Sequence, residues 1–111
     1  MSPEELASRL LTAVESPAGL AVFSLDVVSE EELADLLAKW GLSEALRLRR
    51  LSSSSTRSAL LVVYVNEEAC EKRCVGRCAH RETRCFGECL YDCVTELRRS
   101  VAEALRRAVN R

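Results

Sequence analysis

The stretch CEKRCVGRCAHRETRCFGECLYDC, residues 70–93, contains all six cysteines of the 111-residue chain. They recur at every fourth residue in two sets, Cys70, Cys74 and Cys78 followed by Cys85, Cys89 and Cys93. Because an α-helix turns by about 100° per residue, each set forms one row along a helix. The six residues AHRETR between the sets are enough for a turn between antiparallel helices. The stretch therefore predicts a helical hairpin with two facing rows of cysteines.

The register of the two rows gives each cysteine a facing position on the other helix. Counted outward from the turn, Cys78 faces Cys85, Cys74 faces Cys89, and Cys70 faces Cys93. A disulfide requires Cα atoms about 5.5 Å apart. Adding the backbone radii of two helices then places their axes about 10 Å apart, at the upper end of ordinary helix packing. The spacing is therefore compatible with three nested disulfides.

Two other states of the cysteine array stay open on the sequence alone. Cys74, Cys78, Cys85 and Cys89 could supply four thiolates to zinc or to an iron–sulfur cluster, because C-x2–4-C is a common zinc-ligand spacing. A four-ligand site leaves the outermost pair of cysteines unexplained, although that pair continues the rows in register. Reduced thiols packed in a core are the third possibility. No C-x-x-C motif occurs and the rows lack an obvious activating partner, so a catalytic dithiol is not predicted. With three disulfides, the state that accounts for all six cysteines, no cofactor is expected.

The paired C-x3-C motifs of residues 70–93 resemble those of the twin C-x3-C proteins, the small mitochondrial import chaperones. In that family nested disulfides hold a helical hairpin, so the resemblance implies the same nested pairing here. It covers about a fifth of the chain, which differs by a third cysteine in each row and by a shorter turn. A chaperone function is not inferred from it.

Composition and the N-terminal sequence predict a cytoplasmic protein. The segment MSPEELASRLL has acids where a signal peptide has bases, and no long apolar segment follows, so neither secretion nor membrane association is expected. Disulfides are rare in the cytosol except in hyperthermophiles. The chain has no glutamine, and charged residues make up 30% of it, which favours a thermophilic source.

Capping residues and hydrophobic periodicity predict the remaining elements. In chain order they are a helix after Ser2, strand 20–28, a helix after Ser29, strands 45–51 and 58–65, a helix capped by Asn66, and a long helix from about Arg84. The fold class is therefore α+β, in the order α-β-α-β-β-α-α. The middle elements match part of a ferredoxin-like split unit, with the second strand at a sheet edge. We expect one domain, with an α/β part at 1–65 and the cysteine-rich helices at 66–111.

A basic segment surrounds the serine-rich turn of the second hairpin. Arg47, Arg49, Arg50 and Arg57 lie there, and residues 42–65 contain a single acid, Glu44. A basic β-hairpin can reach phosphates, so nucleic-acid binding is one alternative function. No aromatic residue interleaves the arginines in the sequence, and base stacking is not predicted. A solvated edge strand protected by charge explains the same pattern.

The last predicted helix has an apolar stripe that continues well beyond the final cysteine. Val94, Leu97, Val101 and Leu105 belong to it, and the first helix of the hairpin is too short to cover them. The sheet is the expected cover, because a sheet needs one covered face. A protein partner or a second copy of the chain is the alternative.

The sequence offers no catalytic motif. His80 is the only histidine and lies in the predicted turn, where a solvated side chain is expected. Asp26 lies in the otherwise apolar first strand and is expected to reach water or a helix cap. We therefore expect a non-enzymatic binding or assembly protein, with the hairpin as a rigid element presented to a partner.

Overall fold

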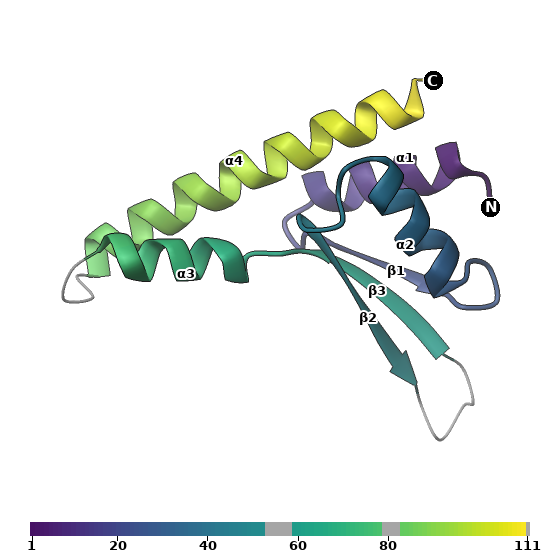
Figure 1. Cartoon of the computed structure of the whole chain (residues 1–111), viewed down its shortest axis with the longest axis horizontal. Helices are drawn as coiled ribbons and strands as arrows, with labels where there is room; N and C mark the ends of the chain where they lie inside the picture. The colour runs from purple at the N-terminus through teal and green to yellow at the C-terminus, as the bar shows by residue number, and fades with distance from the viewer. Residues whose placement is uncertain (53–58, 79–82, 111) are drawn as a thin grey trace.

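The computed structural model describes residues 1–52, 59–78 and 83–110. Its elements are α1 (Pro3–Glu15), β1 (Leu20–Ser24), α2 (Glu30–Lys39), β2 (Leu46–Ser52), β3 (Ala59–Val65), α3 (Glu68–Arg77) and α4 (Thr83–Val109). The order and the α+β class are those predicted from the sequence. Figure 1 shows α1 and α2 on one side of the sheet. α3 and the first half of α4 extend away from the sheet, whereas the second half of α4 lies along α1.

The three strands form an antiparallel sheet in the order β1-β3-β2. The second strand is at an edge, as predicted, and β3 is central. Among the described residues no strand pairs with the outer side of β1, so β1 forms the other edge. A split β-α-β unit adds a fourth strand at that position, which this sheet lacks.

Side-chain caps fix the starts of the first two helices. The hydroxyls of Ser2 and Ser29 accept hydrogen bonds from the backbone N–H groups of Glu5 and Glu32, each at 3.1 Å. Both caps were predicted, because serine satisfies an otherwise unpaired N–H group of the first turn. The cap predicted at Asn66 is wrong. Asn66 is buried, and its side chain donates to the carbonyl of Glu44 at 3.1 Å, which ties β3 to the start of β2.

The element that packs on the apolar stripe of α4 is not the predicted one. The second half of α4 packs on α1, and α1 in turn packs on β1 and β3. Figure 1 shows α1 between α4 and the sheet. Val101 and Leu105 are completely buried there. The prediction that α4 lies on the sheet is wrong because the N-terminal helix already occupies that position.

The first strand is shorter than predicted. It ends at Ser24, and the Ser24 carbonyl accepts hydrogen bonds from the N–H groups of Val27 and Val28, which close a turn. Asp26 therefore lies in this turn and not in the strand, and its side chain is exposed, as expected. A run of apolar and β-branched residues does not show where the strand ends and the turn begins, because both segments contain Val and Leu here.

Candidate functional site

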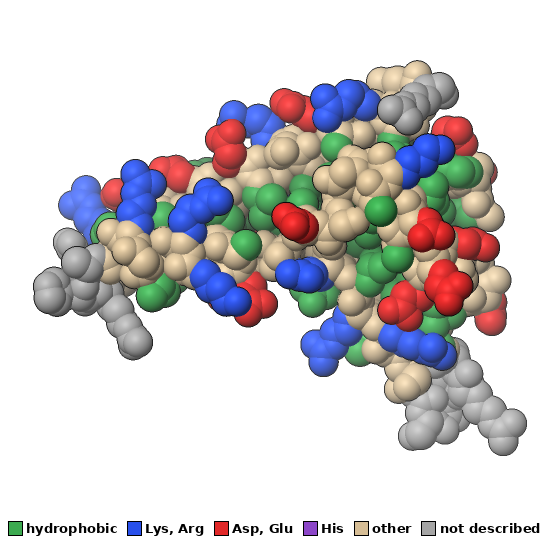
Figure 2. Space-filling model, in the orientation of Figure 1, with side chains coloured by type: hydrophobic (Ala, Val, Ile, Leu, Met, Phe, Trp, Pro, Cys, Tyr) green, Lys and Arg blue, Asp and Glu red, His purple; other side chains and the backbone are tan. Residues whose placement is uncertain are grey.

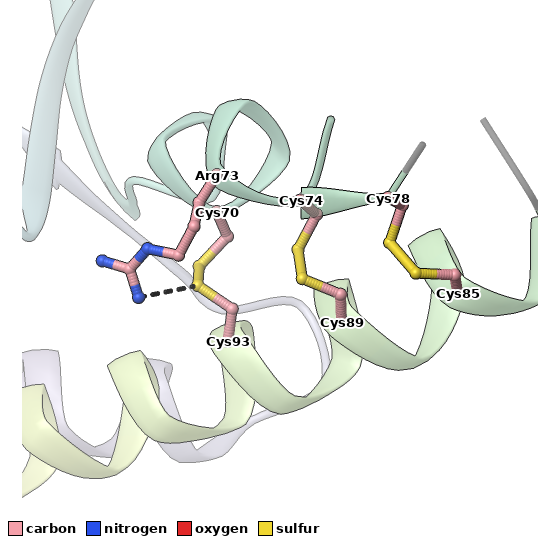
Figure 3. The surroundings of a disulfide bond; sticks show 7 residues. All are labelled: Cys70, Arg73, Cys74, Cys78, Cys85, Cys89 and Cys93. Carbon is pink, nitrogen blue, oxygen red and sulfur yellow. Dashed lines mark hydrogen bonds between the residues drawn. A yellow bond between two sulfur atoms is a disulfide. The ribbon is translucent and has the colours of Figure 1, made fainter. Parts of the chain in front are cut away.

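Three disulfides join α3 to the first half of α4. They are Cys70–Cys93, Cys74–Cys89 and Cys78–Cys85, with Cα–Cα distances of 5.7, 5.7 and 5.8 Å. Figure 3 shows them as a ladder between two antiparallel helices. This confirms the predicted hairpin and its nested pairing. We use "the arm" for α3 together with residues 83–97 of α4.

The disulfides remove the thiolates that the metal alternative requires. Cys74, Cys78, Cys85 and Cys89 are all bonded in pairs, and a sulfur in a disulfide is not a thiolate ligand. Within residues 1–52, 59–78 and 83–110, no group of three or more His, Cys, Asp or Glu side chains could hold a metal ion. The zinc or iron–sulfur interpretation is therefore not compatible with this structure.

Very little apart from sulfur attaches α3 to α4. The buried residues of α3 are Cys70 and Cys74, and the other side chains of this helix are exposed. Val75, its one large aliphatic residue, is 56% exposed. Because α3 lacks an apolar face of its own, the disulfides take the place of a hydrophobic contact between the two helices.

A groove runs along α4 beside the start of α3. It has a volume of about 450 Å³ and is lined by Glu67, Gly87, Leu90, Tyr91, Val94, Thr95 and Arg98. Its apolar residues belong to the same stripe of α4 that α1 covers farther along the helix. Here the stripe is uncovered, and the side chain of Tyr91 is 72% exposed. Leu90 and Tyr91 were not predicted to line a groove, although they lie four and three residues before Val94 in the sequence.

Arg98 lies where the groove meets α1. Its guanidinium donates to the carbonyl of Ser16 at 3.3 Å and to the carboxylate of Glu67 at 3.1 Å. Gly19 has a φ of +63° and lies so close that a Cβ there would be 2.6 Å from an Arg98 nitrogen. Arg98 therefore connects the end of α1, the start of β1 and the root of the arm.

The four residues predicted as a partner surface are divided by the structure. Val101 and Leu105 are completely buried under α1 and cannot reach another molecule. Val94 lines the groove, whereas Leu97 is half-buried against the core. The uncovered part of the stripe therefore lies closer to the disulfides than expected.

One face of the sheet is not covered by any described element, and we call it the open face. Its apolar residues are Leu20, Val22, Leu51, Leu60, Val62 and Tyr64. Side chains alternate between faces along a strand, so these residues point away from the helices. The prediction that strand 58–65 is buried holds only for the face that bears Leu61, Val63 and Val65.

Two of the predicted basic residues lie on the open face. Arg47 and Arg49 are there, opposite Tyr64 and Val62 of β3, whereas Arg50 points to the other face. Arg57 lies outside the described residues, as does His80. Tyr64 was missed as a neighbour of the arginines, because only the register of β2 and β3 brings it beside Arg47. Figure 2 shows basic side chains over β2 and acidic ones over α2.

No protein family, curated protein or solved structure matches this chain. The similarity to twin C-x3-C proteins therefore stays confined to the cysteine pattern and the hairpin. In the described ranges, no helix has both the length and the apolar character needed to cross a membrane.

Proposed function

We propose that this protein is a non-enzymatic binding protein whose arm presents the groove of α4 to a helix of a partner protein. The observation that carries the proposal is the continuous apolar stripe of α4. It is buried by α1 in the second half of the helix, whereas in the first half Leu90 and Val94 are half-buried and Tyr91 is exposed along the groove. An apolar stripe that none of the described residues covers is typical of an interaction site.

The position of α1 favours a helix as the bound element. α1 ends at Glu15, and the next residue, Ser16, accepts a hydrogen bond from Arg98 at the end of the groove. The groove therefore continues the line along which α1 already packs on α4. A partner helix there would lie end to end with α1 and place residues at three- and four-residue spacing against the stripe.

The disulfides explain how the arm can keep this groove in shape without a partner. An interface that is rigid before binding loses less conformational entropy when it forms. Glu67, on the connection from β3 to α3, forms an ion pair with Arg98 at 3.1 Å at the edge of the groove. The groove thus has an apolar floor and a charged rim, as protein interfaces commonly do.

Site-specific photo-crosslinking tests this proposal. Tyr91 is replaced by a photoreactive phenylalanine analogue, and the protein is irradiated in extract of the source organism. We expect an adduct whose linked peptide in the partner is a helix with apolar residues at three- and four-residue spacing. The adduct should be lost in the variant Val94→Glu, which places a charge in the groove.

Glu96 provides the matched control, because it is exposed on the same arm but does not line the groove. The same photoreactive residue at position 96 should give no such adduct. Equal adducts at both positions, or none at position 91, would contradict the proposal.

Nucleic-acid binding is a second candidate, supported by the placement of Tyr64. This side chain is 37% exposed on the open face, and Arg47 is its cross-strand partner. Proteins that bind single-stranded nucleic acid commonly combine bases stacked on aromatic rings with phosphates near basic side chains. The structure therefore supplies the aromatic residue that the sequence alone did not place among the arginines.

For this candidate we expect salt-sensitive binding of a single-stranded RNA oligonucleotide, measured by fluorescence anisotropy. Tyr64→Ala should weaken it about tenfold, because stacking of one base contributes ~1–3 kcal/mol. Arg47→Gln should reduce the slope of affinity against salt. Arg99→Gln, on the exposed side of α4, is the control and should change neither. No binding at low salt would remove this candidate.

A further inference from the structure

The two edges of the sheet are protected very differently. Edge strands expose unpaired backbone groups, and proteins commonly guard them with charged side chains. β2 has three arginines among its seven residues, Arg47, Arg49 and Arg50. β1 has the sequence LAVFS and no charged residue. The β2 edge is thus guarded against pairing with another strand, and the β1 edge is not.

The hydrogen-bond register identifies which backbone groups of β1 point outward. The N–H of Leu25 donates to the carbonyl of Ala59, which makes these two residues a hydrogen-bonded pair. Such pairs alternate along antiparallel strands, so Ala21 and Phe23 also bond to β3. The backbone groups of Leu20, Val22 and Ser24 therefore point away from β3. The Ser24 carbonyl agrees with this, because it bonds to the following turn instead.

We propose that the outer edge of β1 pairs with the same edge of a second copy of this chain. The carbonyl of Ser24 is already occupied, which leaves Leu20 and Val22 with both backbone groups directed outward. These two residues are symmetric about Ala21. A two-fold axis at Ala21 lets Leu20 of each copy exchange two hydrogen bonds with Val22 of the other. The two sheets become one six-stranded sheet.

The side chains of β1 suit this arrangement. On the open face, Leu20 and Val22 are each 44% exposed, and in the dimer each Leu20 lies beside Val22 of the other copy. On the helix side, the residue at the axis is Ala21, which is small enough for the two α1 layers to approach. In an isologous contact both copies use the same surface, so no separate complementary surface is needed. It is independent of the groove on the arm and of the function proposed for that groove.

The dimer is expected to dissociate on dilution, because a contact of two five-residue strands is small. Weak and transient complexes bury less than about 1,200 Å² in total. By sedimentation equilibrium, the mass should rise from the 12.3 kDa of one chain towards twice that value as concentration is raised to about 1 mM. A mass that stays at 12.3 kDa over this range would overturn the proposal.

Two substitutions distinguish edge pairing from stacking of the open faces. Val22→Pro removes an N–H group that points outward and leaves every hydrogen bond to β3 in place. Because proline is tolerated at a strand edge, this variant should fold, and it should stay monomeric. Leu60→Arg places a charge on the open face of the central strand, away from the edge, and should still dimerise. A dimer in Val22→Pro, or a monomer in Leu60→Arg, would overturn the proposal.

Amide exchange by NMR keeps the test independent of how the proline variant folds. In the unmodified protein, exchange of the Leu20 and Val22 amides should slow as concentration rises. The outward amide of Leu48 on the guarded β2 edge is the control, and its exchange rate should not change. Exchange of Leu20 and Val22 that does not depend on concentration would overturn the proposal.

Discussion

Reduction of the three disulfides is expected to detach α3 from α4 while the sheet, α1 and the second half of α4 stay folded. α3 has ten residues and buries only cysteines, and an isolated helix of this length is marginal in water. The outermost bond, between residues separated by 23 positions, is expected to contribute roughly 3 kcal/mol by chain entropy. The inner bonds add less than they would alone, because they close loops inside a loop already closed.

Limited trypsin digestion with and without reductant measures this effect. Cleavage after Lys72, Arg73 and Arg77 should be slow in the oxidised protein and fast after reduction. Intact mass should rise by six hydrogens on reduction, which confirms that all three bonds were present. Val75→Ser is the control within the same helix, because Val75 makes no buried contact and its substitution should leave cleavage slow. Equal cleavage before and after reduction would show that the disulfides do not hold the arm.

Leu105→Ala is expected to reduce the free energy of unfolding by about 2–5 kcal/mol, a large part of the stability of a small domain. Leu105 is completely buried between α4 and α1. Its removal leaves a cavity that the neighbouring helices can fill only in part. The contact between α1 and α4 also attaches the arm to the rest of the molecule. This variant should therefore loosen both the core and the attachment of the arm.

Leu90→Ala is the matched control, since it makes the same substitution on the same helix where α1 does not reach. Leu90 is half-buried in the groove, and its change should cost less than about 1.5 kcal/mol. Urea unfolding followed by circular dichroism compares the two variants. Equal losses at both positions would mean that α1 does not provide the main cover of the stripe.

The hairpin was predictable in detail from the sequence because the residues that determine it lie close together in the chain. A four-residue step fixes one helix face, and a short turn fixes which positions of two such faces meet. The caps at Ser2 and Ser29 were predictable for the same reason, since each depends on a side chain three residues from its partner. The cap assigned to Asn66 failed because a contact distant in sequence, the carbonyl of Glu44, binds that side chain instead.

The cover of the α4 stripe could not be predicted from the stripe itself. An apolar stripe shows that a helix is buried on one side, but α1, the sheet and a second copy were all able to cover it. Only the packing of α1 on β1 and β3 decided the outcome, and that packing left Leu90, Tyr91 and Val94 uncovered.

The sequence CEKRCVGRCAHRETRCFGECLYDC, residues 70–93, by itself determined which cysteines face one another, because helical periodicity is a property of neighbouring residues. The tertiary structure decided which apolar surfaces stay exposed. The open face with Tyr64 beside Arg47, the uncharged edge of β1 and the groove on α4 all depend on which elements pack together. Burial is a property of the whole chain, since the same apolar residue is core or surface according to what covers it.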